Sequence, residues 1–361
     1  MIQRYDFAPL DGITKVVFRQ VYHRMFGGAD RYFIPFFSPT DQHILTKRDQ
    51  RELDPAANAG LPVVPQVMTR RAPDFLWAAE IVADMGYTEV NLNLGCPSGT
   101  VTAKGKGAGF LAKPEELERF FDEVFAAVKL PVSVKTRLGV KEPEEFERLL
   151  DIYNRYPIAC LTIHPRVQKQ FYKGTVHRDW FAWAAERSRN PLCYNGDLVT
   201  VEDCTVFAVD FPAIDAVMIG RGAIADPALL RKLRGGVPAT RQELQTFTRT
   251  LYQSYQDFYG QVGPAAQRMK EVWFFLIHLF EGGERHDKKM RRLRTPGEYE
   301  AVEASIFQEL PLRDHAAGAK SGKEAEEYSS ASFPRISEGD QIQSHLVAEY
   351  PVRLSGQAGD H

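Results

Sequence analysis

The sequence predicts an α/β protein: a (β/α)8 TIM barrel over residues 1–236, followed by a small helical bundle over residues 237–311. Short apolar, β-branched runs alternate with amphipathic helical patterns along the first part, which is typical of parallel α/β folds. Eight such runs are present, as this barrel requires. A doubly wound open sheet is the alternative, but the glycine-rich first turn typical of that fold is missing here.

Each predicted strand is a short apolar run bounded by glycine, proline or polar residues. In order, the runs cover residues 5–9, 32–37, 63–67, 88–94, 132–136, 160–164, 192–195 and Ala216–Ile219. All strands of such a barrel run in one direction, so their carboxyl ends should meet at one rim, where barrel enzymes carry their active sites.

Helices are predicted between most of these strands. Pro73, Pro114 and Pro143 each stand at the start of an amphipathic segment. Proline at the first helical position loses no hydrogen bond, so these are credible helix starts.

The pattern changes after Pro238. A capping box from Thr240 to Glu243 begins a helix that should run to Tyr259, and Gly263–Pro264 should break it. Further helices are predicted over residues 265–280 and 296–310. Residues 312–361 are rich in small and polar side chains, so they are predicted to be disordered.

Composition limits the cellular compartment and the kinds of site that the protein is expected to have. The net charge is −2, and hydrophobic residues make up 44% of the chain. Its four cysteines form no Cys-x-x-Cys pair, which argues against a zinc site or a disulfide framework. No long apolar run suggests a membrane span. These features predict a cytoplasmic protein, monomeric and independent of metals.

The most informative motif is the run from Asn91 to Ser98. A strand ends at Gly95, Cys96 follows at once, and Pro97 stops the strand from continuing. A thiol at the carboxyl end of a barrel strand can give or take a proton. The alternative is that Cys96 is a small buried apolar residue.

Other polar residues share this position at or just past the strand ends. They are Gln66, Asn93, Lys135, Arg137, His164, Arg166, Asn195 and Asp197. Lys135 is the strongest candidate for a functional residue among them, because burying a lysine without a partner anion costs free energy. The alternatives are a solvated lysine and, for His164, a structural histidine.

Two loops suggest a phosphate site. Asn195–Gly196–Asp197 follows the seventh strand and Gly220–Arg221–Gly222 the eighth, where barrels often bind phosphate. Their glycines allow close approach of the backbone, and Arg221 adds charge. A cofactor with one phosphate and a polar ring, such as FMN, fits this description.

Together these motifs resemble the tRNA-dihydrouridine synthases, flavoenzymes that reduce uridine in tRNA. The likeness covers about residues 1–310 and is nearest to the bacterial type C branch, which has serine after the Cys-Pro pair. The motifs that carry it are Ala8 to Thr14, Gln66, Asn91 to Ser98, Lys135 to Arg137, His164 to Arg166, Asn195 to Asp197 and Gly220 to Gly222.

The resemblance implies roles for single residues. NADPH reduces the FMN, Cys96 is the acid, and Asn93 and Arg166 face the target base. The residues implied in FMN binding are Pro9, Leu10, Asp11, Gln66, Lys135, His164, Asn195, Gly196, Asp197, Gly220 and Arg221. Leu10, Asp11 and Pro165 depart from the family's usual Met, Glu and Gly.

A basic segment in the predicted bundle suggests RNA binding. Its cations are Arg285, Lys288, Lys289, Arg291, Arg292 and Arg294. Such a patch can bind phosphates in a near-neutral protein, although it could be a solvated helix end. Two other functions remain open: an FMN barrel reductase of a small pyrimidine or enone, and a tRNA-binding protein without catalysis.

Overall fold

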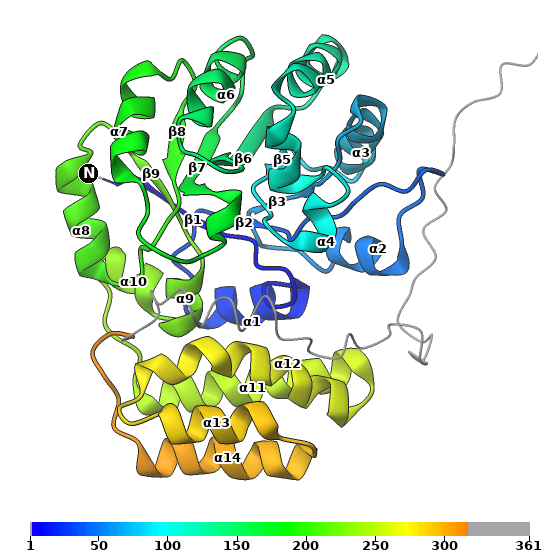
Figure 1. Cartoon of the computed structure of the whole chain (residues 1–361). Coiled ribbons are helices and arrows are strands. Elements are labelled where there is room, and N and C mark those ends of the chain that lie inside the picture. Colours follow the sequence, from blue (N-terminus) through cyan, green and yellow to red (C-terminus); the bar gives the residue numbers. More distant parts are fainter. Residues whose placement is uncertain (1, 317–361) are drawn as a thin grey trace, which may run out of the picture.

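The computed structural model describes residues 2–316. Nine parallel strands follow one another around a barrel, with helices on its outer surface (Figure 1). The strands are β1 (Arg4–Phe7), β2 (Arg31–Phe33), β3 (Val63–Val64), β4 (Gln66–Val67), β5 (Val90–Leu94), β6 (Val132–Gly139), β7 (Leu161–Val167), β8 (Leu192–Tyr194) and β9 (Ala216–Ile219). The predicted barrel is confirmed, and the open doubly wound sheet is excluded.

The barrel closes at Pro65. This proline divides the predicted strand 63–67 into β3, which pairs with β2, and β4, which pairs with β5. Proline has no N–H to donate to a neighbouring strand, so the ladder is interrupted there. β3 and β4 are therefore the two ends of the sheet order, and the short step between them completes the ring.

Two strands extend beyond their predicted ends. β6 continues to Gly139 and β7 to Val167, with a shift in register between Arg137 and Gly139. The extension places Arg137 and Arg166 within the sheet, and both side chains are buried. Sequence patterning ends these strands too early, because arginine is a poor signal for a buried strand.

Helices cover the outside of the barrel, and a small apolar cluster fills its inside. The interior cluster consists of Ala8, Phe33, Val64, Cys160, Cys193, Ala216 and Met218. The helices and helical turns of this part are α1 (Val16–Met25), α2 (Lys47–Leu53), α3 (Ala72–Asp84), α4 (Gly99–Thr102), η1 (Gly107–Ala112), α5 (Pro114–Ala127), α6 (Glu145–Tyr153), η2 (Gln168–Gln170), α7 (Arg178–Arg187), α8 (Val201–Asp210), α9 (Arg221–Ala225) and α10 (Leu229–Leu233).

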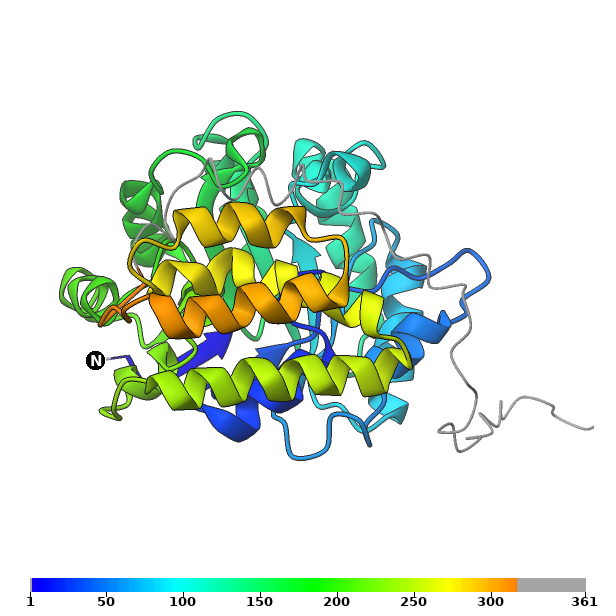
Figure 2. The ribbon, with the colours of Figure 1, turned by 90° about the horizontal axis from the view of Figure 1, so that it is seen from below.

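A group of helices lies across one end of the barrel (Figure 2). Its members are α11 (Arg241–Tyr259), α12 (Val262–Leu276), η3 (Ile277–Leu279), α13 (Glu284–Arg292) and α14 (Pro296–Glu309). The capping box at Thr240 is confirmed, since its side chain accepts from Glu243 N–H and the Glu243 carboxylate accepts from Thr240 N–H.

Two predictions for this bundle need correction. The second helix begins at Val262, before Pro264, rather than at residue 265. Proline is tolerated there because the first turn of a helix needs no N–H donors. The sequence prediction also missed α13, whose buried side chains are only His286 and Met290, too few to give an apolar period.

The bundle is joined to the barrel through buried aromatic contacts. Phe247 of α11 packs edge-on against Phe18 and Phe26, at the two ends of α1, with ring centroids 6.1 and 5.2 Å away. Leu312, in the predicted tail, pairs with Phe280 in an isolated antiparallel bridge. The rest of the predicted tail, from residue 317, lies outside the described residues.

Candidate active site

A cavity of about 800 Å³ opens at the carboxyl ends of the strands. Gln267, Arg268, Glu271 and Phe275 of α12 line it from the bundle side. The predicted residues that line it are Pro9, Leu10, Asp11, Gln66, Asn93, Cys96, Lys135, His164, Asn195, Gly196, Asp197, Gly220 and Arg221. The structure therefore brings all of the residues proposed for catalysis and cofactor binding into one cavity.

The turn that carries Cys96 is held by Asn93. The Asn93 side-chain oxygen accepts from the backbone N–H groups of Gly95 and Cys96, at 3.0 and 2.9 Å. Cys96 lines the cavity, and burial is the main cause that raises the pKa of its thiol. Cys96 therefore remains protonated near neutral pH, as a proton donor must.

Lys135 lies on β6 with its ammonium in the cavity wall. No hydrogen bond or ion pair joins it to another residue among 2–316. Burial, assisted by the nearby Arg137 guanidinium, lowers its pKa to about 7. A buried amine in this state is poised to gain charge when an anion or a strong acceptor binds beside it.

His164 is held neutral and in one tautomer. Burial lowers its pKa well below the usual value, and the surrounding arginines and Lys135 act in the same direction. Arg166 Nη1 lies 3.1 Å from His164 Nε2. A guanidinium can only donate, so Nε2 accepts and the proton is on Nδ1. His164 thus offers one N–H donor.

Arg166 differs from its predicted place. It is completely buried and is not among the residues that line the cavity. Its guanidinium binds the Asp197 carboxylate through both nitrogens, at 3.0 and 2.6 Å. Through these contacts Arg166 orients Asp197 and His164.

Asp197 connects Arg166 with Arg221. Its Oδ1 also accepts from Arg221 Nη2 at 2.7 Å, so this carboxylate is occupied by two guanidinium groups. The other terminal nitrogen of Arg221, Nη1, is buried and has no hydrogen-bond partner within residues 2–316. An unpaired guanidinium N–H in a cavity wall is a donor for an anion.

Beside Arg221, glycine keeps the backbone close to the neighbouring loop. A Cβ at Gly222 would lie 2.6 Å from the Leu198 carbonyl oxygen and 2.7 Å from Val199 Cα. A Cβ at Gly220 would lie 3.1 Å from Ala8 Cβ and Leu10 Cδ1. A side chain at position 222 would push the loops that follow β8 and β9 apart, and one at position 220 would crowd the segment that follows β1.

Sequence reasoning missed several residues of the cavity wall. The guanidinium groups of Arg137 and Arg221 both lie over the ring of Tyr172, at 5.3 and 5.2 Å from its centroid. Tyr172 follows η2 in a loop, where no periodic signal marks it. Lys15 and Arg48 also line the cavity, and with Arg268 they bring its lysine and arginine side chains to six, against three carboxyl side chains.

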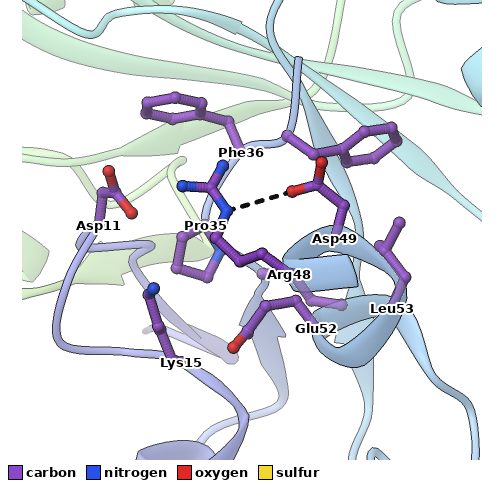
Figure 3. Close-up of a pocket in the computed structure, with 10 residues that line it drawn as sticks. Asp11, Lys15, Pro35, Phe36, Arg48, Asp49, Glu52 and Leu53 are labelled. Carbon is purple, nitrogen blue, oxygen red and sulfur yellow. Dashed lines mark hydrogen bonds and ion pairs between the residues drawn. The ribbon is translucent and has the colours of Figure 1, made fainter. Parts of the chain in front are cut away.

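A side cavity of about 10 Å³, close to the space of one water molecule, adjoins the large one. Asp11 and Lys15 lie on one side of it, and Arg48, Asp49 and Glu52 of α2 on the other (Figure 3). Arg48 Nε donates to Asp49 Oδ1 at 3.3 Å. Both signs of charge are present, so this side cavity does not select an anion.

The predicted basic segment forms α13 and the turn after it. All six cations are exposed. Arg285, Lys288, Lys289 and Arg292 are spaced three or four residues apart and therefore share one face of the helix. Arg291 is different, because it binds Asp287 and lies over the ring of Phe274.

No helix within residues 2–316 is long and apolar enough to cross a membrane. The same residues hold no group of three or more histidine, cysteine or acidic side chains arranged to bind a metal ion.

Comparison with known proteins gives a consistent result. The model of the dihydrouridine synthase (Dus) family matches residues 6–310. "Probable tRNA-dihydrouridine synthase 1" of Synechocystis sp. is 31% identical, over 74% of this chain and 76% of the relative. The tRNA-dihydrouridine(16) synthase of Ralstonia nicotianae is 32% identical, over 65% of this chain and 73% of the relative.

Proposed function

The chain belongs to the dihydrouridine synthase family, and we propose that it reduces the C5=C6 bond of uridines in tRNA to 5,6-dihydrouridine, with FMN as cofactor and NADPH as reductant. The observation that carries this proposal is the combination of a protonated thiol and an excess of cationic side chains in one cavity. Residues 1–236 would be the catalytic part and residues 237–311 the tRNA-binding part.

The residues of the cavity fit FMN. The unpaired Nη1 of Arg221 and the close approach at Gly220 suit a phosphate. Lys135 and the Nδ1–H of His164 suit polar acceptor atoms on a ring. The volume of about 800 Å³ is within the usual range for cofactor and ligand sites. When bound, the flavin supplies the hydride for the reduction.

Cys96 would supply the proton. Addition of a hydride to C6 would leave negative charge at C5 and its conjugated carbonyl, and a thiol with a raised pKa holds its proton until that charge develops. Asn93 fixes the turn that presents the thiol. The uridine must leave its stack to reach the cavity, because the flavin cannot enter an RNA helix.

The experiment is a Cys96→Ala variant with a Cys204→Ala control, whose thiol is buried on α8 outside the cavity. We expect Cys96→Ala to retain bound flavin and NADPH oxidation, while dihydrouridine formation falls by about 10²- to 10⁴-fold. The control should keep full activity. Unchanged product formation in Cys96→Ala would overturn the role of the thiol.

Two further measurements separate the other functions. Rapid reduction of free uridine or a small enone, with no response to tRNA, would indicate a small-molecule reductase. A protein that remains colourless after incubation with excess FMN, yet binds tRNA regardless of Cys96, would indicate a binding protein. Visible flavin absorbance with tRNA-dependent oxidation of the reduced flavin supports the synthase.

A further inference from the structure

A series of side-chain hydrogen bonds runs along one face of the sheet from Glu89, just before β5, to the Cys96 turn. It passes from strand to strand, because Asn91 lies opposite Gln66 on β4 and opposite Ser133 on β6. The bonds are Asn93 Nδ2 to Gln66 Oε1 (2.8 Å), Gln66 Nε2 to Asn91 Oδ1 (2.7 Å), Asn91 Nδ2 to Ser133 Oγ (2.8 Å) and Ser133 Oγ to Glu89 Oε1 (2.5 Å).

The charged end of this series sets the direction of every bond in it. Arg31 Nη1 donates to Glu89 Oε2 at 2.8 Å, so Glu89 is a salt-bridged carboxylate that accepts hydrogen bonds. The Ser133 hydroxyl has one hydrogen, and it donates this hydrogen to Glu89 Oε1 in a hydrogen bond. Ser133 Oγ can then only accept from Asn91, which fixes the orientation of the Asn91 amide.

The same constraint continues to the cavity. With its nitrogen facing Ser133, Asn91 presents its oxygen to Gln66, and Gln66 presents its own oxygen to Asn93. Asn93 is left with its oxygen toward the backbone N–H groups of Gly95 and Cys96. A reversed amide at any step would oppose two donors or two acceptors in a buried site.

We infer that Glu89 and Ser133 are positioning residues for the Cys96 turn. Neither lines the cavity, yet together they fix the amides of Gln66 and Asn93, which do. Each of those amide groups has a second N–H, which takes no part in this series of hydrogen bonds. The inference rests on the proposed function and deepens it. It identifies the residues that hold the Cys96 thiol and the free N–H groups of Gln66 and Asn93 in fixed positions relative to one another.

The test uses Ser133→Ala, which removes the hydroxyl, and Glu89→Gln, which keeps the shape of the side chain but can donate to Ser133 and reverse the series. Thr136→Val is the matched control. Thr136 is a buried hydroxyl on the same strand, but it bonds to Tyr153 of α6 on the outside of the barrel. Ser133→Thr retains a hydroxyl and should restore wild-type behaviour.

The first measurement is the alkylation rate of Cys96 by iodoacetamide, followed by peptide mass spectrometry in FMN-loaded protein without RNA. The other cysteines are buried. We expect Ser133→Ala and Glu89→Gln to change the Cys96 rate several-fold, because the turn loses its fixed acceptor, while Thr136→Val and Ser133→Thr leave it unchanged. This measurement decides the inference even if the proposed substrate is wrong.

The second measurement is steady-state dihydrouridine formation. Both variants should lower kcat on the order of tenfold or more, with little change in KM for tRNA or in the rate of NADPH oxidation. Folded variants with wild-type alkylation and kcat would overturn the inference. An equal change in Thr136→Val would also overturn it, because general loosening of β6 would then explain the effect.

Discussion

Lys135 shows how one buried side chain links charge to ligand binding. Its pKa of about 7 lies far below the value of about 10.4 for a lysine in an unfolded chain. Between these pH values the unfolded protein binds one more proton than the folded, flavin-free protein. The contribution of Lys135 to the free energy of unfolding should therefore rise with pH across this window. Lys135→Met should lack this contribution, so the stability of the wild type relative to Lys135→Met should rise with pH.

The same shift predicts proton uptake when FMN binds. An acceptor placed beside Lys135 favours the charged amine and raises its pKa. At pH 8.5, binding of FMN to flavin-free protein should therefore take up a fraction of a proton, rising toward about one for a large shift. Calorimetry in two buffers with different ionisation enthalpies measures this number.

Lys135→Met should show no such uptake, whereas a control at the exposed Lys129 should behave as wild type. At pH 5.5 the wild type should lose the effect as well, since Lys135 is already charged before FMN binds. Equal uptake in wild type and Lys135→Met at pH 8.5 would place the titrating group elsewhere.

Helix α13 should provide much of the salt-dependent attraction for tRNA. We expect the double change Lys288→Glu and Arg292→Glu to weaken tRNA binding, because two phosphate contacts on one helix face become repulsive. The slope of log Kd against log salt concentration should decrease by about 2. Binding measured by fluorescence anisotropy at several salt concentrations tests this.

The matched control reverses Lys129 and Arg189, two exposed cations in the loops that precede β6 and β8, at the opposite end of the barrel from the cavity. It changes the net charge by the same amount. If both double variants weaken binding equally, overall charge rather than α13 attracts the RNA.

The elements differ in how well sequence predicted them. α5 and α14 begin at their predicted prolines, and β9 has its predicted bounds, because proline and β-branched runs act locally. The split at Pro65 and the start of α12 depend on which backbone N–H groups must donate hydrogen bonds in the folded protein. The hydrophobic pattern of the sequence does not contain this information. α13 is defined mainly by its packing against α12 and α14.

Some residues of the candidate site could likewise be predicted from the sequence, and others could not. Its strand-end residues could be predicted, since the carboxyl ends of all barrel strands converge on one rim. Arg268 and Glu271 could not, because they reach the cavity from α12, far along the chain, and only the docking of the bundle places them there. The family resemblance assigned Arg166 to the target base, and nothing in the sequence indicated its ion pair with Asp197.

Docking of the bundle should make the barrel and the helices unfold as one cooperative unit. Phe247 of α11 is almost fully buried against Phe18 and Phe26. In wild-type protein, the release of bound flavin, which reports on the barrel, and the loss of helical circular dichroism should therefore coincide in urea.

Phe247→Ala should remove about 3–5 kcal/mol from this contact and separate the two transitions, because the bundle loses its main attachment to α1. Phe120→Ala is the control: Phe120 packs on Phe75 and Phe110 within the barrel part. It should move both transitions to lower urea together. Coincident transitions in Phe247→Ala would mean that other contacts, such as that of Arg268 with the Gly12 carbonyl, suffice to couple the two parts.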